Sequence, residues 1–395
     1  MLEEFVTLGT WWLPQNPQVV VPGKLSFSPE NGVTLELYGS FYSSPFEQIG
    51  EIENTSFPSE VSPINENPNV TYGVPVNFIK PEESIILGLL VDNNEEVTLY
   101  RCIGIVAKFQ FMKQRTTLSF NIESIFRNIH FKDTQDIKFK SISVQYSNLR
   151  EWIGKSGIQV FKLQDYQPLI CYQRPSNIHL ATIDNLDLNI TFSQEYLNPF
   201  DFYLEAQYYK INIEQKTYLT LQNAYNQPLD ECIELLINFR DLLSFAMTKP
   251  SSIIEIIGKI DVSQTKVISQ ASGESAQEQE LKEIKVPILF GLWNSAKTSK
   301  IEISTDKMLF LFSDVENNLG EIFEEWIKKR ETYEPVFELL MTTMYTPNLY
   351  LHYKFLNIVQ ALEAYHTSKY EGIYQDAKVY EKGLYQEFKK VLKDF

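Results

Sequence analysis

A carboxylate and an imidazole lie three residues apart near the end of the chain, at Glu363 and His366. On a helix this spacing places both side chains on one face. An imidazole titrates near neutral pH, so it can move a proton or, when charged, contact a phosphate. The alternative is that both residues are solvated on the helix surface. Residue type and spacing alone leave both interpretations open.

The rest of the chain offers few groups in a recognisable chemical pattern. The sequence contains no GxGxxG after a strand, no GxxxxGK[ST], no HExxH and no GxSxG. Its three cysteines, Cys102, Cys171 and Cys232, form no CxxC pair, and no two of its four histidines are three or four residues apart. We therefore expect no metal and no cofactor, and we expect three reduced, buried thiols.

The composition indicates a folded and acidic protein. Of its 395 residues, 44% are apolar and 13% aromatic, which excludes a disordered chain. The 35 Lys and Arg residues against 51 Asp and Glu residues give a net charge of −16. This charge argues against a general nucleic-acid coat but does not exclude a local RNA site. With no signal peptide and no apolar run near the roughly 20 residues of a membrane span, we expect a cytoplasmic protein without membrane contact.

Strands and helices, in two successive parts of the chain, would position a site of this kind. Up to about residue 225, alternation of apolar and polar residues predicts short strands, with turn residues between them. The clearest of these strands are Lys24–Ser28, Val33–Tyr38, Val97–Ile103, Ile137–Val144 and Leu186–Phe192. Such a series favours an antiparallel sandwich or barrel. A short helix is predicted at Leu149–Ile153.

The pattern changes near residue 228. Helical spacing of apolar residues predicts a helix at about 228–246. Two more strands are expected at Ser252–Ile257 and Val286–Phe290. Between them, residues at about 262–282 are rich in Ser, Gln, Gly and Glu, and this composition predicts a mobile polar loop. From about residue 314 onward, every apolar stripe has helical spacing.

Three segments, in order along the chain, carry a family resemblance. The N-terminal blocks Leu8–Pro14, Val21–Phe27 and Gly32–Gly39 resemble the opening of ApeA-like proteins, which are bacterial anti-phage defence proteins. Asn148–Ile158 resembles a second block of that family, and Phe355–His366 resembles a helix of its C-terminal HEPN domain. Each block is moderately specific alone. Together they span nearly the whole chain.

The resemblance implies an α+β protein. Residues 1–300 would form a large antiparallel β-rich N-terminal domain, sandwich-like or barrel-like, that contains the 228–246 helix and the polar loop. Residues 314–395 would form an all-α HEPN-like helical bundle, incomplete at its C-terminus. The family further implies abortive infection by a toxin-like, metal-independent endoribonuclease that acts as a homodimer on tRNA or other host RNA. The N-terminal domain would respond to a phage-derived trigger.

In the HEPN family the catalytic signature is an Arg followed, after four to six residues, by a His. The Arg holds a phosphate and the His moves a proton, while a polar residue on an earlier helix orients them. By resemblance, Glu363 is the orienting residue and His366 an accessory one. The signature is absent from the helical region, because the last arginine is Arg330 and no His follows it at that spacing. We therefore expect residues 1–395 alone to lack ribonuclease activity.

One match to the signature lies elsewhere, at Arg174 and His179. It falls in the strand-rich half, and Pro175 disfavours helical angles at Arg174. We expect it to be a chance match. Two accounts of the missing signature stay open. Either the sequence ends, about 30 residues after the block that carries Glu363, before the helix that would supply it, or the protein is a natural variant without the site.

Several other residues have both a structural and a functional interpretation. Trp11 and Trp12 are expected to anchor the first strand with one ring on each side, and an exposed recognition patch is the alternative. The run Lys328–Arg330 predicts a solvated helix face, with RNA contact as the alternative. Arg150 and Trp152 are expected to support the fold rather than to bind a ligand.

Three functions remain open at this level. The first is an abortive-infection effector that cleaves RNA. The second is a non-catalytic sensor or binding protein that uses its helical region for dimerisation, and the acidic charge slightly favours it. The third is an unrelated ligand-binding β-sandwich, supported only by the aromatic content, which core packing already explains.

Overall fold

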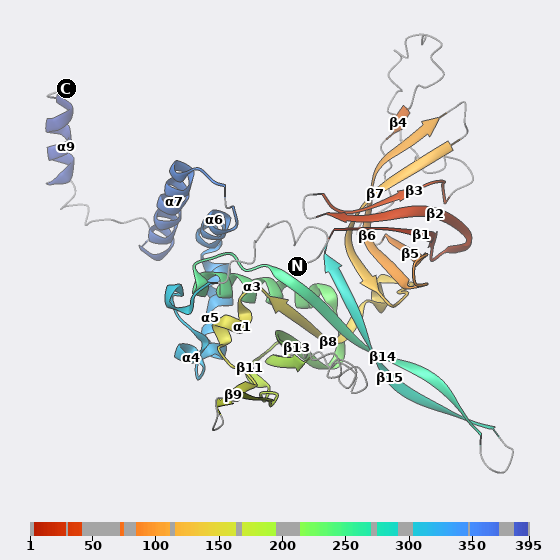
Figure 1. Cartoon of the computed structure of the whole chain (residues 1–395). Coiled ribbons are helices and arrows are strands. Elements are labelled where there is room, and N and C mark those ends of the chain that lie inside the picture. The colour runs from red at the N-terminus through yellow and green to blue at the C-terminus, as the bar shows by residue number, and fades with distance from the viewer. Residues whose placement is uncertain are drawn as a thin grey trace, which may run out of the picture.

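A six-stranded barrel forms the N-terminal part of the computed structural model (Figure 1). The structure describes residues 4–28, 31–41, 72–74, 84–110, 115–162, 168–194, 214–269, 275–290, 303–346, 348–370 and 383–393. Neighbouring strands of the barrel are antiparallel, and the pairing of β6 with β7 closes the ring. Its strands are β1 (Phe5–Leu13), β2 (Asn16–Ser28), β3 (Gly32–Leu37), β5 (Ile85–Leu90), β6 (Glu96–Gln110) and β7 (Arg115–Arg127). A short strand, β4 (Tyr72–Val74), pairs with β6.

The barrel interior is packed around Trp11, which is fully buried. Two glycines on strands that border β1 make room for this ring. A Cβ added at Gly88 would lie 2.2 Å from Trp11 Cε3, and one at Gly23 would lie 2.9 Å from Trp11 Cδ1. Trp12 points the other way, into a second core, where its ring meets His130 edge-on at 5.3 Å. The prediction of one ring on each side of the first strand is confirmed.

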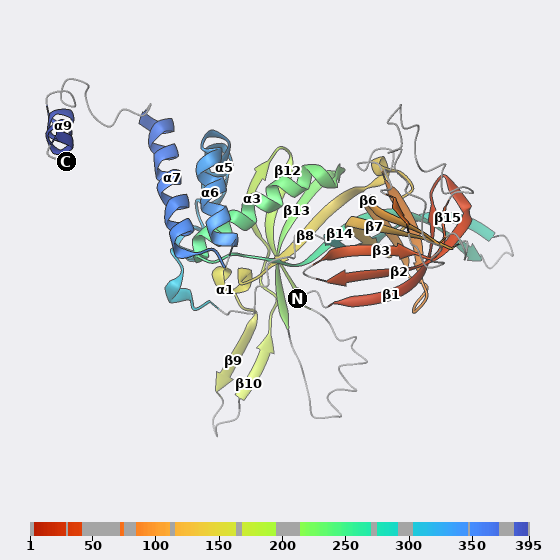
Figure 2. The ribbon, with the colours of Figure 1, turned by 90° about the horizontal axis from the view of Figure 1, so that it is seen from above.

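Beyond the barrel the same sheet continues in six further antiparallel strands, here called the flanking sheet. Its order is β11-β12-β13-β8-β14-β15, and residues Ile288–Phe290 of β15 pair with β7 of the barrel. The strands are β8 (Lys138–Tyr146), β11 (Ile178–Ile183), β12 (Leu186–Gln194), β13 (Gln215–Pro228), β14 (Ile253–Ser269) and β15 (Ser275–Phe290). A separate hairpin of β9 (Ile158–Lys162) and β10 (Pro168–Tyr172) projects from it (Figure 2).

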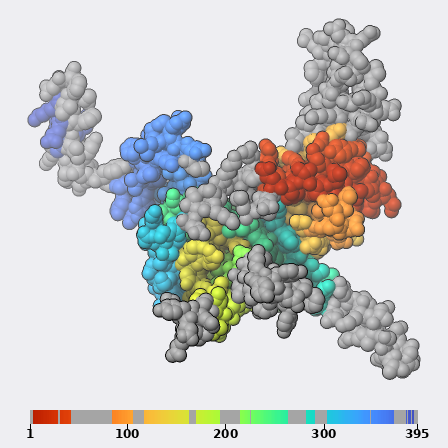
Figure 3. Space-filling view, in the orientation of Figure 1, coloured from red at the N-terminus to blue at the C-terminus, as the bar shows by residue number. Residues whose placement is uncertain are grey.

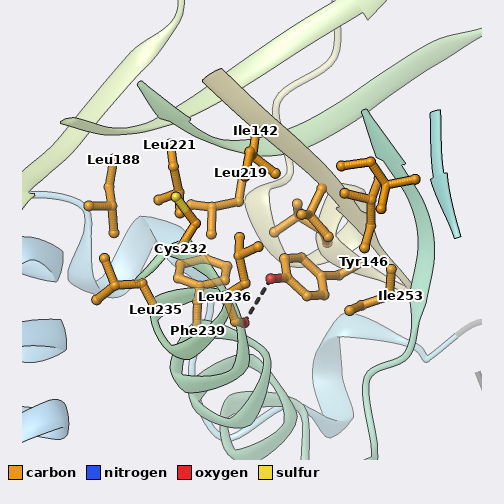
Figure 4. Packing of buried hydrophobic residues seen from close by; sticks show 14 of the residues in the cluster. Ile142, Tyr146, Leu188, Leu219, Leu221, Cys232, Leu235, Leu236, Phe239 and Ile253 are labelled. Atoms are coloured by element: carbon orange, nitrogen blue, oxygen red, sulfur yellow. Dashed lines mark hydrogen bonds between the residues drawn. The ribbon is translucent and has the colours of Figure 1, made fainter. Parts of the chain in front are cut away.

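Helix α3 (Leu229–Met247) lies across the flanking sheet and forms the second core with it. In Figure 4 the apolar side chains of α3, among them Leu236 and Phe239, point at residues of the strands. The hydroxyl of Tyr146 on β8 donates to the carbonyl of Leu236 at 2.8 Å. The predicted helix at about 228–246 is therefore present, and it owes its stability to packing on the sheet.

Of the remaining helices, those that carry Trp152 and Phe323 pack beside α3, against Phe239. Short helix α1 (Leu149–Ile153) ends at Gly154, whose φ of 67° is the left-handed conformation that favours glycine. It buries Trp152, whose indole donates to the carbonyl of Phe310 at 3.0 Å, so the expected structural role of Trp152 is confirmed. Arg150 pairs with its neighbour Glu151. The other helices are η3 (Thr134–Asp136), η5 (Thr305–Lys307), α4 (Phe312–Val315), α5 (Leu319–Thr332), α6 (Glu334–Tyr345), α7 (Leu351–Tyr370) and α9 (Leu384–Lys393).

The α+β fold class, with a β-rich N-terminal region followed by helices, is confirmed. The mobile polar loop expected at about 262–282 is wrong. Here β14 and β15 pair as a long two-stranded ribbon, up to the pair Ser269–Ser275, and residues 270–274 of the expected loop lie outside the described residues. In this ribbon the backbone groups of each strand that face the other strand are paired in one antiparallel ladder. Among the described residues, no helix is long and apolar enough to cross a bilayer.

Candidate functional site

The strongest concentration of buried charge lies where α3 meets the C-terminal helices. We call it the Asp241 cluster. It comprises Asn238, Arg240, Asp241 and Ser244 of α3, Arg330 of α5 and Tyr345 of α6. Asp241 lies at its centre with only 2% of its side chain exposed. A carboxylate this deep in a protein needs partners to offset its lost hydration.

Both oxygens of Asp241 are occupied. Oδ1 accepts from the Tyr345 hydroxyl at 2.7 Å and from Arg240 Nη2 at 3.0 Å. Oδ2 accepts from Arg330 Nη1 at 2.7 Å. Two guanidinium groups therefore surround one carboxylate, and the acceptor sites of the carboxylate are satisfied within the fold. The arrangement is suited to holding helices together rather than to binding a substrate.

Tyr345 joins the cluster by both its hydroxyl and its ring. The hydroxyl lies 2.8 Å from Ser244 Oγ, and Arg240 Cζ lies 4.6 Å from the ring centroid, within cation–π range. Burial and the adjacent Asp241 carboxylate raise the pKa of Tyr345 well above its usual value. The hydroxyl therefore stays protonated at neutral pH and keeps donating to Asp241.

Arg330 corrects one expectation. The run Lys328–Arg330 was expected to be a solvated helix face, and Lys328 fits, with 66% of its side chain exposed. Arg330 does not fit, because it turns inward to Asp241 and also donates to Asn238 Oδ1 at 3.0 Å. A signal for this was present on the partner helix. Asn238, Asp241 and Ser244 are polar residues three apart within the otherwise apolar buried face of 229–247.

Glu363 and His366 lie together on α7, as their spacing predicts. Glu363 is exposed, while His366 is half-buried with its ring 5.1 Å from that of Tyr370. Neither belongs to the Asp241 cluster. Their role in catalysis stays a prediction.

Arg174 and His179, the match to the signature, lie on a loop and on an edge strand. Arg174 lies before β11 and contacts Asn177 at 3.5 Å, whereas His179 lies on β11 with Nδ1 3.3 Å from Asn189 Oδ1. β11 is at one edge of the flanking sheet, far from α7 in Figure 1. The structure does not bring this pair together with Glu363 and His366.

The described residues also offer no group of three or more His, Cys, Asp or Glu side chains that could hold a metal ion. All three cysteines are free thiols; Cys102 and Cys232 are buried, whereas Cys171 is partly exposed. Burial raises the pKa of Cys232 to about 12 and that of Cys102 further. Burial therefore disfavours the reactive thiolate form of both groups at neutral pH.

Comparison with known proteins assigns the chain to a family. The family model described as ApeA N-terminal domain 1 matches residues 7–326. The chain belongs to this family. The ApeA domain thus includes the barrel, the flanking sheet, α3 and the first half of α5, and it supports a place in anti-phage defence. No curated protein and no solved structure matches the chain.

The ApeA domain reaches into α5 but includes neither α6 nor α7. The resemblance to ApeA-like proteins is therefore confirmed, while a HEPN domain at 314–395 and its boundary stay predictions. Asp241 lies within the matched residues, whereas Arg330 and Tyr345 lie beyond them. The Asp241 cluster thus joins the ApeA domain to the helices that follow it.

Proposed function

We propose that this protein is an abortive-infection effector of the HEPN type, in which the ApeA domain senses a phage-derived trigger and the C-terminal helices serve cleavage of tRNA or other host RNA. The observation that carries the proposal is the family match over residues 7–326. The helices α6 and α7, which follow the ApeA domain and include Glu363 and His366, support the second half of the proposal.

The sequence lacks the Arg-x4–6-His signature in its helical region. We therefore expect residues 1–395, purified and mixed with RNA in the presence of a chelator, not to cut it. Robust metal-independent cutting would show that another group supplies the chemistry. Glu363→Gln and His366→Gln would then show whether these two residues take part, with the exposed Gln360→Ala on the same helix as the control.

The defence function is tested in bacteria infected with a panel of phages. We expect cells that express this protein to limit phage yield. Sequencing of their RNA before and after infection separates the two proposed modes, because new tRNA or other RNA ends would favour the nuclease. Protection without new RNA ends would contradict the nuclease and favour the non-catalytic alternative. Absence of protection against every phage tested would argue against both.

One specific observation favours the alternative, a non-catalytic sensor that dimerises through its helical region. Helix α7 exposes apolar side chains in a repeating spacing of four and three residues. They are Leu351 at 83%, Phe355 at 65%, Ile358 at 46% and Leu362 at 63%. This is the spacing of a seam between two packed helices. In Figure 3 the region of α6 and α7, in blue, protrudes from the body of the molecule.

A second copy of the chain is the occupant we propose for this face. The mass in solution, measured by light scattering after gel filtration, should be that of two chains. Phe355→Gln together with Leu362→Gln should shift it toward one chain, because both side chains are exposed and their replacement leaves the fold intact. Gln360→Ala should leave the mass unchanged. A monomeric wild-type protein would exclude this dimer.

A further inference from the structure

We propose that α6 and α7 form a unit that separates from the rest of the fold as one piece, and that the hydrogen bond of the Tyr345 hydroxyl is its main attachment. Such a unit would exist whether or not the protein cleaves RNA. Local opening of this kind is common in proteins, and it begins where few apolar contacts hold an element in place. Three features of the described residues carry the proposal.

The first feature is that α6 and α7 hold each other. Their mutual packing is the most extensive between any two helices of the described part of the chain. Asn357 of α7 donates to Thr343 Oγ1 of α6 at 3.2 Å. Tyr333, just before α6, lies 5.4 Å from Tyr365 of α7, measured between ring centroids. The two helices can therefore stay together when their contacts to other elements break.

The second feature is that the pair has little apolar attachment to the rest. Helix α6 buries Met341 and α7 buries Ala361, and every other residue of the two helices is at least partly exposed. The main ring contact to the body is that of Phe337 with Trp326 of α5, edge-on at 4.9 Å. Because apolar burial is the dominant stabilising term in folding, this pair is held weakly by it.

The third feature is that the polar attachment to α3 is concentrated in one side chain. Tyr345 is the last residue of α6, and its three partners, Arg240, Asp241 and Ser244, all lie on α3. Among the described residues, it is the α6 side chain that hydrogen-bonds to α3. Arg330 also holds Asp241, but it lies on α5 and remains there if α6 leaves.

The bond from Tyr345 to Asp241 has a charged acceptor in a buried site. Such bonds contribute more than neutral ones, and their loss corresponds to a change of about tenfold to hundredfold in an equilibrium. Removal of the hydroxyl should therefore raise the population of the open state by about this factor. The ring and its contact with Arg240 remain in Phe, so that the change isolates the hydroxyl.

The test is hydrogen exchange of the full chain, read by mass spectrometry peptide by peptide. In Tyr345→Phe we expect amides of residues 334–370 to exchange about tenfold faster or more. Amides of β8 and of α3 should keep their wild-type rates. Tyr146→Phe is the matched control, because it removes another buried hydroxyl that hydrogen-bonds to α3, at the carbonyl of Leu236, and not to α6. It should not accelerate 334–370 selectively.

Three outcomes would overturn the proposal: unchanged exchange at 334–370 in Tyr345→Phe, an equal acceleration throughout the chain, or a change in α6 without α7. A measurement on the wild-type protein provides a second test that needs no variant. Exchange at 334–370 in low urea should share one opening, with a weaker urea dependence than exchange in the flanking sheet. The same dependence in both regions would mean that the two helices open only when the whole protein unfolds.

Discussion

Helices α3 and α7 have almost the same length, 19 and 20 residues, yet they differ most in how they are held. Most of α3 is buried between the flanking sheet and the other helices, and aromatic rings of several elements meet at its centre. Most of α7 is exposed, including large apolar side chains. Helix α3 is therefore held by a fully packed core. Helix α7 has apolar surface that the described part of its own chain does not cover.

The difference shows which contacts stabilise the flanking sheet with α3 and which hold α6 and α7. In the flanking sheet, stability is distributed over many apolar contacts, so that no single polar bond decides whether α3 stays in place. At α6 and α7, a few contacts near Tyr345 and Phe337 carry the attachment. Equal chemical changes in the two regions should therefore have unequal consequences, and this can be tested.

The largest effect is expected from Phe239→Ala. The Phe239 ring lies within 5.7–6.4 Å of the rings of Phe323, Tyr146 and Trp152. Its removal leaves a cavity in the second core, and we expect the free energy of unfolding to fall by about 4 kcal/mol. Urea denaturation followed by circular dichroism measures it. Phe355→Ala on α7 is the comparison, and it should change the free energy of a monomer by less than about 1 kcal/mol because Phe355 is exposed. Similar losses for both would contradict the contrast.

A smaller loss is expected from Asp241→Asn, which tests the junction between the two regions. The change leaves Arg240 and Arg330 without the carboxylate that both of them pair with, and it should cost about 3 kcal/mol. Asp230→Asn is the control on the same helix. Asp230 pairs with Arg101 at 3.0 Å but is half-exposed, so we expect a loss of about 0.5 kcal/mol. Thermal melts of the two variants compare them directly. Equal melting temperatures would show that burial of Asp241 has no special weight.

Gly88→Ala addresses the barrel, a third environment. The added Cβ would lie 2.2 Å from Trp11, inside a closed ring of strands that cannot move aside freely. We expect a loss of about 2 kcal/mol. Gly154→Ala gives a useful comparison, because no atom lies within 4 Å of its added Cβ and the cost there arises from φ of 67° alone. If Trp11→Phe fails to restore part of the stability of Gly88→Ala, the clash is not the cause.

Much of the fold was predictable from local patterns, and the exceptions have physical reasons. Val33, Leu35 and Leu37 alternate with polar residues, and all three point into the barrel. The ribbon of β14 and β15 was not predicted at 262–282, because Ser, Gln, Gly and Glu are frequent there and this composition is typical of a loop. Arg330 was also misassigned, because its partner Asp241 lies 89 residues away in the sequence. Local charge pattern cannot reveal a contact of that range. The spacing of Glu363 and His366 correctly places them on one helix, but it does not say what they meet there.

The smallest expected effect is a pH-dependent loss in the free energy of unfolding that depends on Tyr345. Burial and Asp241 raise the pKa of Tyr345 in the folded protein, whereas a tyrosine in the unfolded chain titrates near pH 10. Below that pH both states are protonated, so the hydroxyl contributes its full stabilisation. As pH rises further, the unfolded chain releases the proton first, and the free energy of unfolding falls. By pH 11 we expect the wild type to have lost about 1 kcal/mol more than Tyr345→Phe, measured by urea denaturation between about pH 8 and 11. Burial also raises the pKa of Tyr146, and Tyr345 contributes to that shift, so the comparison is repeated in a Tyr146→Phe background. Parallel losses in the two proteins would mean that α6 had already released Tyr345 before the sheet unfolds, and that outcome would separate the two regions even more sharply.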